Sequence, residues 1–383
     1  MRANYLLLYC MLLAMSSAAQ DRRVARGTQD LLAVPIEVMP FRANEALLAD
    51  ELARREPGVA PKFAHKFATS INPSTHGLWE EIPGGIAVWR LAIYSAGAKS
   101  LNLGFTEFHM PKEGKMLLYT PDKRQVMGPF SPADNESHGQ LWTPILEGDE
   151  LVIEVQVPYT AKQGLKLQLS AISHDFLGFA QIASGECNLD VACGSSDGWG
   201  IVEGYRDVIR SVANIGLLGD SYCTGYLVSN TRNDQTPYFI TADHCGFGLN
   251  NAATLVAYWG FENSSCRQPG GGSSGGGGDG ALETYNSGAF FRAAYPPADV
   301  TLLELDDPVP IAAAPFMAGW DITNTPTTDT IACIHHTNND EKRISFEFDP
   351  TYFGTWERDN DYVPNGNHLI VPDWDIGTTE GGS

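Results

Sequence analysis

Short segments of alternating apolar and polar residues dominate the first half of the chain. They lie between Gly77 and about Leu169, and turns rich in glycine, proline and aspartate separate them. The clearest examples are residues 86–94, 115–119, 151–157 and 165–169. Short strands at this spacing predict a β-sandwich over residues 77–169.

One helix is expected before these strands, over residues 44–55, because apolar residues recur there at helical spacing. Asn44 is its expected N-cap. Four aromatic residues of the strand region have two possible roles, a buried core or a sugar-binding surface, and we favour the core. These residues are Phe105, Phe108, Phe130 and Trp142.

In the second half of the chain, two apolar runs are predicted to form paired strands, at residues 226–228 and 238–240. The second run leads into His244 and Cys245, and Cys223 lies just before the first. Cross-strand neighbours lie within disulfide range, so Cys223 is well placed to reach Cys245. Such a disulfide would hold the His244 ring in a fixed orientation, as a general base requires. A lone histidine is more often structural than catalytic, so a catalytic role depends on the rest of the chain.

Several segments resemble the bacterial lysyl endopeptidase group of secreted trypsin-like serine proteases. The sequence Thr-Ala-Asp-His-Cys ending at Cys245 is similar to the catalytic-histidine segment of that group. Four other segments resemble the start of the mature enzyme, the catalytic-aspartate strand, part of the second barrel and the approach to the nucleophile. They are residues 187–193, 298–305, 334–345 and 379–383. The likeness covers roughly residues 182–383, in the order of the family.

The resemblance implies an all-β protein built in three parts. Residues 1–19 would be a signal peptide and residues 20–181 an N-terminal propeptide that contains the β-sandwich. Residues 182–383 would form a chymotrypsin-like double β-barrel, a protease domain whose second barrel is incomplete. The activity implied is a serine endopeptidase that uses a Ser-His-Asp triad and cleaves after basic residues.

Peptide hydrolysis of this kind needs a nucleophile, a base, a carboxylate that orients the base, and donors for the oxyanion. The resemblance implies His244 as the base and Asp299 as the orienting carboxylate. Asp299 opens the apolar run 300–305, which would bury it beside the imidazole; alternatively, it caps a turn after two prolines. The chain order His, Asp, then Gly-Gly-Ser favours the catalytic role.

The nucleophile depends on how the last residues are matched to the family. In the preferred register Gly382 donates a backbone N–H to the oxyanion hole, and Ser383 stands just before the attacking serine. We therefore expect a truncated sequence that lacks the nucleophile, and no peptidase activity from these 383 residues. A weaker register makes Ser383 itself the nucleophile. A serine before the nucleophile forms no ion pair with a new N-terminus, so activation would differ from that of pancreatic zymogens.

The N-terminus and the charge bear on location and partners. Residues 1–19 combine a charged start at Arg2, a short apolar run and a small-residue cleavage site, as a secretory signal does. The apolar run is too short to span a bilayer. A formal charge of -21 argues against nucleic-acid binding, which needs a basic patch. We expect a secreted, extracellular monomer that acts on proteins or peptides and binds neither nucleic acid nor membrane.

Six of the seven cysteines lie beyond the expected signal peptide, and export favours disulfides over metal ligation. No C-x-x-C or H-E-x-x-H motif is present, so we expect no metal and no cofactor. The resemblance implies the pairs Cys223–Cys245 and Cys193–Cys266, and leaves Cys187 to bond a cysteine further on. Cys333 has no counterpart in the family, and we favour a buried thiol over a bond to Cys187.

Four further features allow more than one interpretation. The glycine-rich stretch 269–280 is expected to be a flexible surface loop within the catalytic unit. His335 and His336 are expected to be structural, because neighbouring strand residues point to opposite faces and make a poor metal-binding pair. Trp356 would lie near the specificity pocket by resemblance, or be an ordinary buried residue. The expected junction, residues 179–182, has no lysine: either another protease cuts there, or specificity differs, or the segment stays attached.

A different class of function is a secreted, non-catalytic binding protein, in which the sandwich holds a glycan and the barrel is a relic. A metal-dependent hydrolase is a more distant third.

Overall fold

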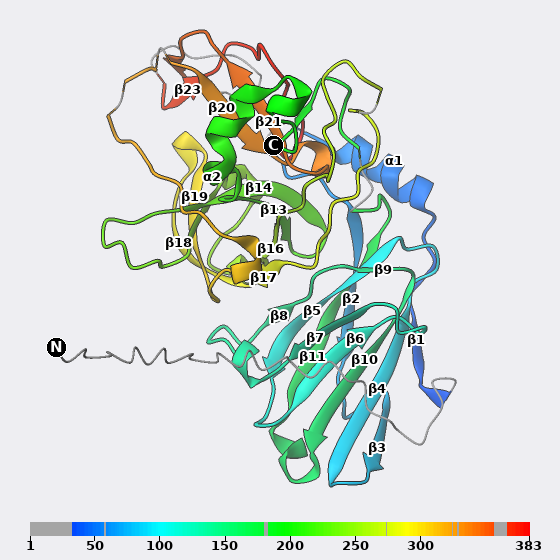
Figure 1. Ribbon diagram of the computed structural model, residues 1–383. Helices are drawn as coiled ribbons and strands as arrows, with labels where there is room; N and C mark the ends of the chain where they lie inside the picture. Colours follow the sequence, from blue (N-terminus) through cyan, green and yellow to red (C-terminus); the bar gives the residue numbers. More distant parts are fainter. Residues whose placement is uncertain are drawn as a thin grey trace, which may run out of the picture.

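The computed structural model describes residues 33–56, 59–179, 183–272, 274–323, 325–327, 329–355 and 366–383. It has a sandwich of two sheets formed by the first half of the chain and a double-barrel unit formed by the second half (Figure 1). The expected signal peptide, the junction residues 180–182 and Trp356 lie outside the described residues. No helix in the described part of the chain is long and apolar enough to cross a membrane.

The sandwich packs a six-stranded sheet on a five-stranded sheet. The first sheet has the order β1-β4-β10-β6-β7, with β3 paired to β4. Its strands are β1 (Ile36–Val38), β3 (Leu78–Ile82), β4 (Ile86–Tyr94), β6 (Lys115–Tyr119), β7 (Val126–Phe130) and β10 (Glu150–Pro158). The second sheet has the order β2-β11-β5-β8, with β9 paired to β5. Its strands are β2 (Ala64–Ile71), β5 (Ser100–His109), β8 (Leu141–Trp142), β9 (Leu146–Glu147) and β11 (Lys166–Asp175).

The predicted sandwich is confirmed, but its bounds are wider than the sequence indicated. β4 and β6 have the predicted ends, and β10 gains one residue at each end. β1 and β2 precede the predicted start at Gly77, and β11 continues past Leu169 to Asp175. The alternation in β11 disappears because its last five residues are all buried, which removes the period-two signal.

The four aromatic residues of the sandwich belong to its interior. Phe105, Phe108, Phe130 and Trp142 are between 0% and 5% exposed, so they form core and not a sugar-binding surface. The glycan-binding alternative loses the residues on which it depended.

The predicted helix is α1 (Asn44–Arg54), but its cap differs from the prediction. Ala43 is the N-cap and makes no side-chain hydrogen bond there. The Asn44 side chain instead donates to the Gly97 carbonyl at 2.9 Å and accepts from His174 Nε2 at 2.8 Å. Tertiary contacts to the sandwich therefore take up the polar atoms that a cap would have used.

The second half of the chain forms a seven-stranded sheet in the order β17-β16-β13-β14-β15-β19-β18. Its strands are β13 (Val212–Leu217), β14 (Ser221–Val228), β15 (Tyr238–Thr241), β16 (Val256–Trp259), β17 (Tyr285–Ser287), β18 (Ala289–Tyr295) and β19 (Val300–Leu305). Ile215, Leu227, Phe239 and Leu303, each 0% exposed, fill its interior.

A smaller half-barrel completes the unit. It contains the three-stranded sheet β12-β21-β20, made of β12 (Leu189–Asp190), β20 (Ile331–His335) and β21 (Arg343–Glu347). The pair β22 (Tyr352–Gly354) and β23 (His368–Ile370) lies beside it in Figure 1. The short helix α2 (Arg206–Ile209) precedes β13. The all-β, chymotrypsin-like class with an incomplete second barrel is confirmed.

Both expected disulfides are present, Cys223–Cys245 and Cys193–Cys266. Cys187 is exposed and Cys333 partly buried, and within the described residues neither is disulfide-bonded, so the alternative Cys187–Cys333 pair does not form. Burial raises the pKa of the Cys333 thiol to about 11, as expected of an inert thiol.

The two halves of the chain share an interface that β14 organises. The Tyr222 amide donates to the Pro61 carbonyl at 3.0 Å, and the Phe63 amide donates to the Asp220 carbonyl at 2.9 Å. The Lys62 ammonium contacts the Asp220 carboxylate at 2.8 Å. Phe63 and Tyr222 also share one apolar cluster with residues of both halves. The segment after α1 therefore lies along the start of β14.

Candidate active site

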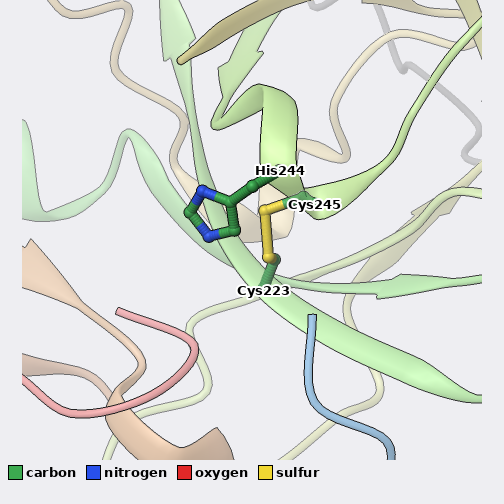
Figure 2. Close-up of side chains that lie close together, drawn as sticks. All are labelled: Cys223, His244 and Cys245. Carbon is green, nitrogen blue, oxygen red and sulfur yellow. A yellow bond between two sulfur atoms is a disulfide. The ribbon is translucent and has the colours of Figure 1, made fainter. Parts of the chain in front are cut away.

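His244 lies on a short turn that directly follows β15. The turn, Asp243–Cys245, ends at Gly246, whose φ of 89° lies in the left-handed region that glycine tolerates. Cys245 ties the turn to Cys223 on β14, so the histidine is fixed both by its strand and by a disulfide (Figure 2). The two strands pair in register, with Gly225 opposite Thr241.

Asp299 meets His244 through two hydrogen bonds. The ring Nδ1–H donates to Asp299 Oδ2 at 2.6 Å, and the His244 backbone amide donates to Oδ1 at 2.8 Å. The two residues meet because β15 and β19 pair with Thr241 opposite Thr301, which places the end of one strand beside the start of the other. The Asp299 carboxylate therefore orients the imidazole and does not cap the preceding turn.

The pair is more exposed than the sequence predicted. The side chains of His244 and Asp299 are 39% and 36% exposed, so the carboxylate is not buried beside the imidazole as expected. The reason is local: Asp299 follows the turn Pro296–Ala298 and has a φ of 50°, which carries it out of the strand before the buried residues begin.

The hydrogen bonds set the protonation of both groups. The bond to Asp299 raises the pKa of His244 above its ordinary value, and partial burial opposes this less strongly. Burial by itself would raise the pKa of Asp299, but the bonds from the His244 ring and amide outweigh it, and His368 on β23 adds to them. The pKa of Asp299 therefore lies below its usual value.

These shifts predict how Asp299→Asn changes stability with pH. The raised pKa of His244 stabilises the fold below the unfolded value of about 6.5, and this gain is lost as pH rises through the folded pKa. The lowered pKa of Asp299 stabilises the fold above about 3.9, and this gain is lost as pH falls through the folded value. Urea unfolding should therefore show a larger loss in the variant near pH 5.5 than at pH 9. An equal loss at both values, or an equal pH trend in the exposed control Asp329→Asn, would contradict the pairing.

The nearness of Cys223, His244 and Cys245 does not make a metal site. One candidate ligand atom from each lies within 4.8 Å of the others. The two sulfurs are joined as a disulfide, however, so neither is a thiolate ligand, and the ring Nδ1 already bonds Asp299.

Gly382 lies close to this turn through Thr224, the neighbour of Cys223. The Thr224 hydroxyl donates to the Gly382 carbonyl at 2.7 Å. Gly382 has a φ of 90°, and a Cβ there would lie 2.7 Å from the Tyr222 ring, so both backbone and space require glycine. Within the described residues its N–H donates no hydrogen bond. That N–H is therefore free to bind a ligand oxygen.

Ser383 pairs with a different histidine. Its hydroxyl hydrogen-bonds His335 Nδ1 at 3.0 Å and accepts from the Glu380 amide at 3.0 Å. His335 is fully buried, and burial together with Arg343 lowers its pKa to about 3. Such a histidine is a poor base at neutral pH, so the contacts of Ser383 do not support the register that makes it the nucleophile.

His335 and His336 have the structural surroundings expected of them. Besides Ser383, His335 bonds the Ser345 hydroxyl at 3.2 Å, and His336 Nδ1 donates to the Asp340 carbonyl at 3.0 Å. His336 also stacks on Phe261, with ring centroids 5.8 Å apart. Burial holds the pKa of His336 well below its ordinary value.

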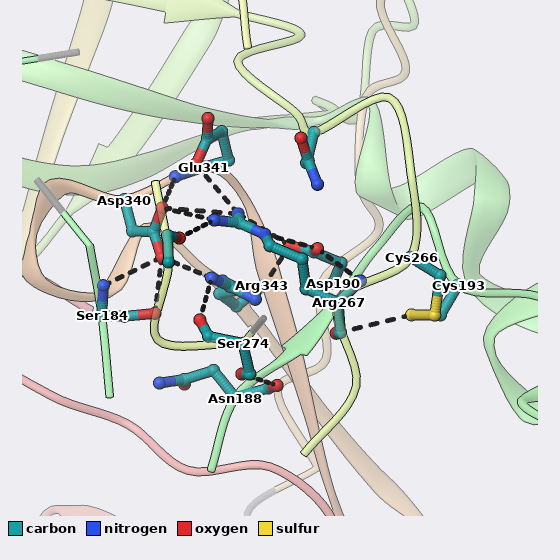
Figure 3. A network of polar contacts seen from close by, with 12 residues as sticks. Ser184, Asn188, Asp190, Cys193, Cys266, Arg267, Ser274, Asp340, Glu341 and Arg343 are labelled. Carbon is teal, nitrogen blue, oxygen red and sulfur yellow. Dashed lines mark hydrogen bonds and ion pairs between the residues drawn. A yellow bond between two sulfur atoms is a disulfide. The ribbon is translucent and has the colours of Figure 1, made fainter. Parts of the chain in front are cut away.

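A buried ion network joins the first residues of the unit to β21, and sequence reasoning missed it (Figure 3). Arg267 contacts Asp190 at 2.8 Å and Glu341 at 2.9 Å, while Arg343 contacts Asp190 at 3.0 Å and Asp340. All five side chains are at most 4% exposed. Their positions run from 190 to 343 along the chain, and no local pattern links them.

The network shifts the pKa values of its carboxyl groups in opposite directions. Burial raises the pKa of Glu341 to about 7, helped by the neighbouring Asp340 carboxylate. Burial would also raise the pKa of Asp340, but a hydrogen bond from Glu341, the charge of Arg343 and a hydrogen bond from Ser184 hold it far below its usual value. Ser184 donates to Asp340 through its hydroxyl at 2.6 Å and its amide at 3.0 Å.

Part of the glycine-rich stretch packs against this network, so the stretch lies only partly on the surface as expected. Ser274 is fully buried, and its hydroxyl donates to the Asn188 carbonyl at 2.6 Å. The Gly276 carbonyl accepts from Arg267 at 2.6 Å, and the Gly280 amide donates to Glu341 at 3.1 Å. The glycines allow the backbone itself to approach the charged groups.

A double-barrel β unit that carries a histidine and an aspartate at the ends of two paired strands defines the chymotrypsin-like class of serine proteases. Residues 182–383 match the family model for the lysyl endopeptidase C-terminal domain, and residues 58–176 match that for the lysyl endopeptidase N-terminal domain. The chain belongs to the lysyl endopeptidase family.

A similar protein is the lysyl endopeptidase of Pseudomonas aeruginosa. The two are 26% identical over 383 residues, a match that covers 88% of this chain and 80% of the relative. The chain is thus a lysyl endopeptidase-like protease, and the substrates that a protease family suggests are proteins or peptides. The similarity and the two disulfides are consistent with an extracellular location.

Proposed function

We propose that this protein is a secreted serine endopeptidase that cleaves after basic residues through a Ser-His-Asp triad. His244 is the general base and later the general acid, and Asp299 holds its tautomer. The observation that carries the proposal is the two-point contact of Asp299 with His244. It occupies Nδ1, while within the described residues Nε2 makes no hydrogen bond and is available to take the proton of a nucleophile.

The oxyanion donor in this proposal is the Gly382 N–H. Its support is a free N–H on a glycine whose carbonyl bonds Thr224, next to the disulfide that holds the His244 turn. In this register the attacking serine follows Ser383. We therefore expect these 383 residues alone to hydrolyse no peptide. Hydrolysis of a lysine-containing peptide by the purified chain, abolished by His244→Ala, would contradict this register.

We further propose that residues 20–181 are a propeptide that lies beside the active site before processing. Its support is the contact of residues 61–63 with Asp220 and Tyr222, at the start of the strand that carries Cys223. In Figure 2 this segment, drawn in blue, approaches Cys223 while the C-terminal segment, drawn in red, approaches from the other side. The docked sandwich would hinder a long substrate on the side of the disulfide.

The docking can be tested after the junction at residues 180–182 is replaced by a specific cleavage site. After cleavage the sandwich should stay bound to the barrel unit and elute with it in size-exclusion chromatography. Phe63→Ala should weaken this association at least about tenfold, because Phe63 is 2% exposed and shares an apolar cluster with Tyr222, Val256 and Tyr258 of the barrel unit. The matched control is Phe41→Ala, since Phe41 is 73% exposed. Equal effects of both changes would rule out this interface.

A further inference from the structure

Three carboxylates that the proposed mechanism does not use meet at the end of β21. Glu347 is the last residue of that strand, Asp349 follows it, and Asp373 belongs to a returning segment. One oxygen from each lies within 4.8 Å of the others. The segment is held in place by a bridge in which the Phe346 amide donates to the Ile376 carbonyl at 2.8 Å. The fold thus brings together carboxylates from two distant parts of the chain.

Glu347 is unusual because it is fully buried and only half satisfied. It is 0% exposed, and its Oε1 accepts from the Asp349 amide at 2.7 Å. Its Oε2 is buried with no hydrogen-bond partner. A buried carboxylate oxygen without a partner is costly, so such a group normally has a cation or a donor beside it.

Among the described residues, no positively charged side chain supplies that partner. Within the described ranges, no lysine, arginine or histidine forms an ion pair with Glu347, Asp349 or Asp373. The buried carboxylates Asp190 and Asp340, in contrast, are both paired with arginines. Three like charges in one place without a counter-charge repel each other, and a bound cation would remove that repulsion.

We propose that Glu347, Asp349 and Asp373 bind a calcium ion. Carboxylate oxygens are the ligands that hard cations prefer, whereas zinc favours nitrogen and sulfur. Calcium binds oxygen at about 2.3–2.6 Å, so oxygens up to about 4.8 Å apart fit across one ion. Magnesium binds at about 2.0–2.1 Å and demands a tighter octahedron. Asp349 and Asp373 are exposed, so water has access to the remaining coordination positions.

The ion would connect β21 to the segment that leads into the C-terminal residues. Beyond Asp373, the Trp374 indole donates to the Thr379 hydroxyl at 3.3 Å, and the Ser345 hydroxyl donates to the Thr378 carbonyl at 2.8 Å. Gly382 follows a few residues later. Calcium would therefore stabilise the half-barrel and the backbone that approaches Gly382, whatever the catalytic status of the chain.

The test uses the purified 383-residue chain after removal of metal with EDTA. Calcium chloride should raise its unfolding temperature in a saturable way, and magnesium chloride at the same concentration should raise it less. Terbium, which replaces calcium, should gain luminescence sensitised by tryptophan, and Trp374 is next to Asp373. Glu347→Gln, Asp349→Asn and Asp373→Asn should each abolish both responses, whereas the exposed control Asp329→Asn should keep them.

Two results would overturn the site. One is an unfolding temperature of the unaltered protein that does not respond to calcium. The other is a response that persists in the carboxylate variants, since calcium would then bind elsewhere. Asp349 and Asp373 are exposed, so their asparagine variants should fold and decide the question even where Glu347→Gln does not.

Discussion

Asp299→Asn should lower kcat about 10⁴-fold in the protein continued past Ser383 by its natural coding sequence, with little change in KM. The His244 backbone N–H can only donate, so it would keep the asparagine oxygen as its acceptor, and the side-chain NH2 would face Nδ1. Nδ1 would then accept a hydrogen bond and Nε2 would carry the ring proton. His244 would then have no acceptor nitrogen facing the nucleophile, so it could not take the proton of the attacking serine. Asparagine tolerates the left-handed backbone at this position, where φ is 50°, so the turn should persist.

Kinetics and structure together check this prediction. The rate should be measured on a peptide with one lysine, and the ring tautomer by NMR of the imidazole nitrogens. The matched control is Asp243→Asn, because Asp243 neighbours His244 but bonds the Thr301 hydroxyl at 3.1 Å and not the ring. A loss below tenfold in Asp299→Asn, or equal losses in both variants, would remove Asp299 from the triad.

Arg267→Met should lower the free energy of unfolding by about 3–5 kcal/mol. Arg267 is 4% exposed and lies between the buried carboxylates of Asp190 and Glu341. Methionine fills much of the same space, but it removes the cation that pairs with Glu341 and leaves Asp190 with Arg343 alone. Removing one partner of a buried ion pair is far more costly than losing a surface contact. The change should be measured by urea unfolding at pH 7.

The control for Arg267→Met is Arg232→Met. Arg232 contacts Asp234 at 3.1 Å with its side chain 68% exposed, and such a surface pair contributes about 0–1 kcal/mol. A loss in Arg267→Met no larger than in Arg232→Met would show that the buried network does not hold the half-barrel together. The double variant Arg267→Met with Glu341→Gln should recover part of the loss, because Arg267 supplies the ion pair of Glu341 and glutamine carries no charge.

Much of the fold could be predicted because its strands carry their own signals. The runs that became β4 and β6 are strongly apolar and have turn residues on both sides, so their bounds were correct. β11 was cut short because its buried end has no alternation. The Asn44 cap failed because the side chain bonds residues far along the chain, Gly97 and His174, and a helix signal contains no such information.

The candidate site was partly predictable for a different reason. His244 and Cys245 follow a strand whose pairing could be predicted, and the family resemblance indicated Asp299. In the structure Asp299 bonds the His244 ring, but it is more exposed than the apolar run 300–305 had suggested. The ion network around Arg267 and the carboxylates near Glu347 could not be predicted, because each joins residues that only the tertiary fold brings together.

The most direct test of the proposed triad is to read the coding sequence beyond Ser383 and label the resulting protein with a serine-reactive fluorophosphonate. We expect a serine as the next residue, labelled in the unaltered protein and not in His244→Ala. A different residue there, or labelling that does not depend on His244, would contradict the proposed mechanism.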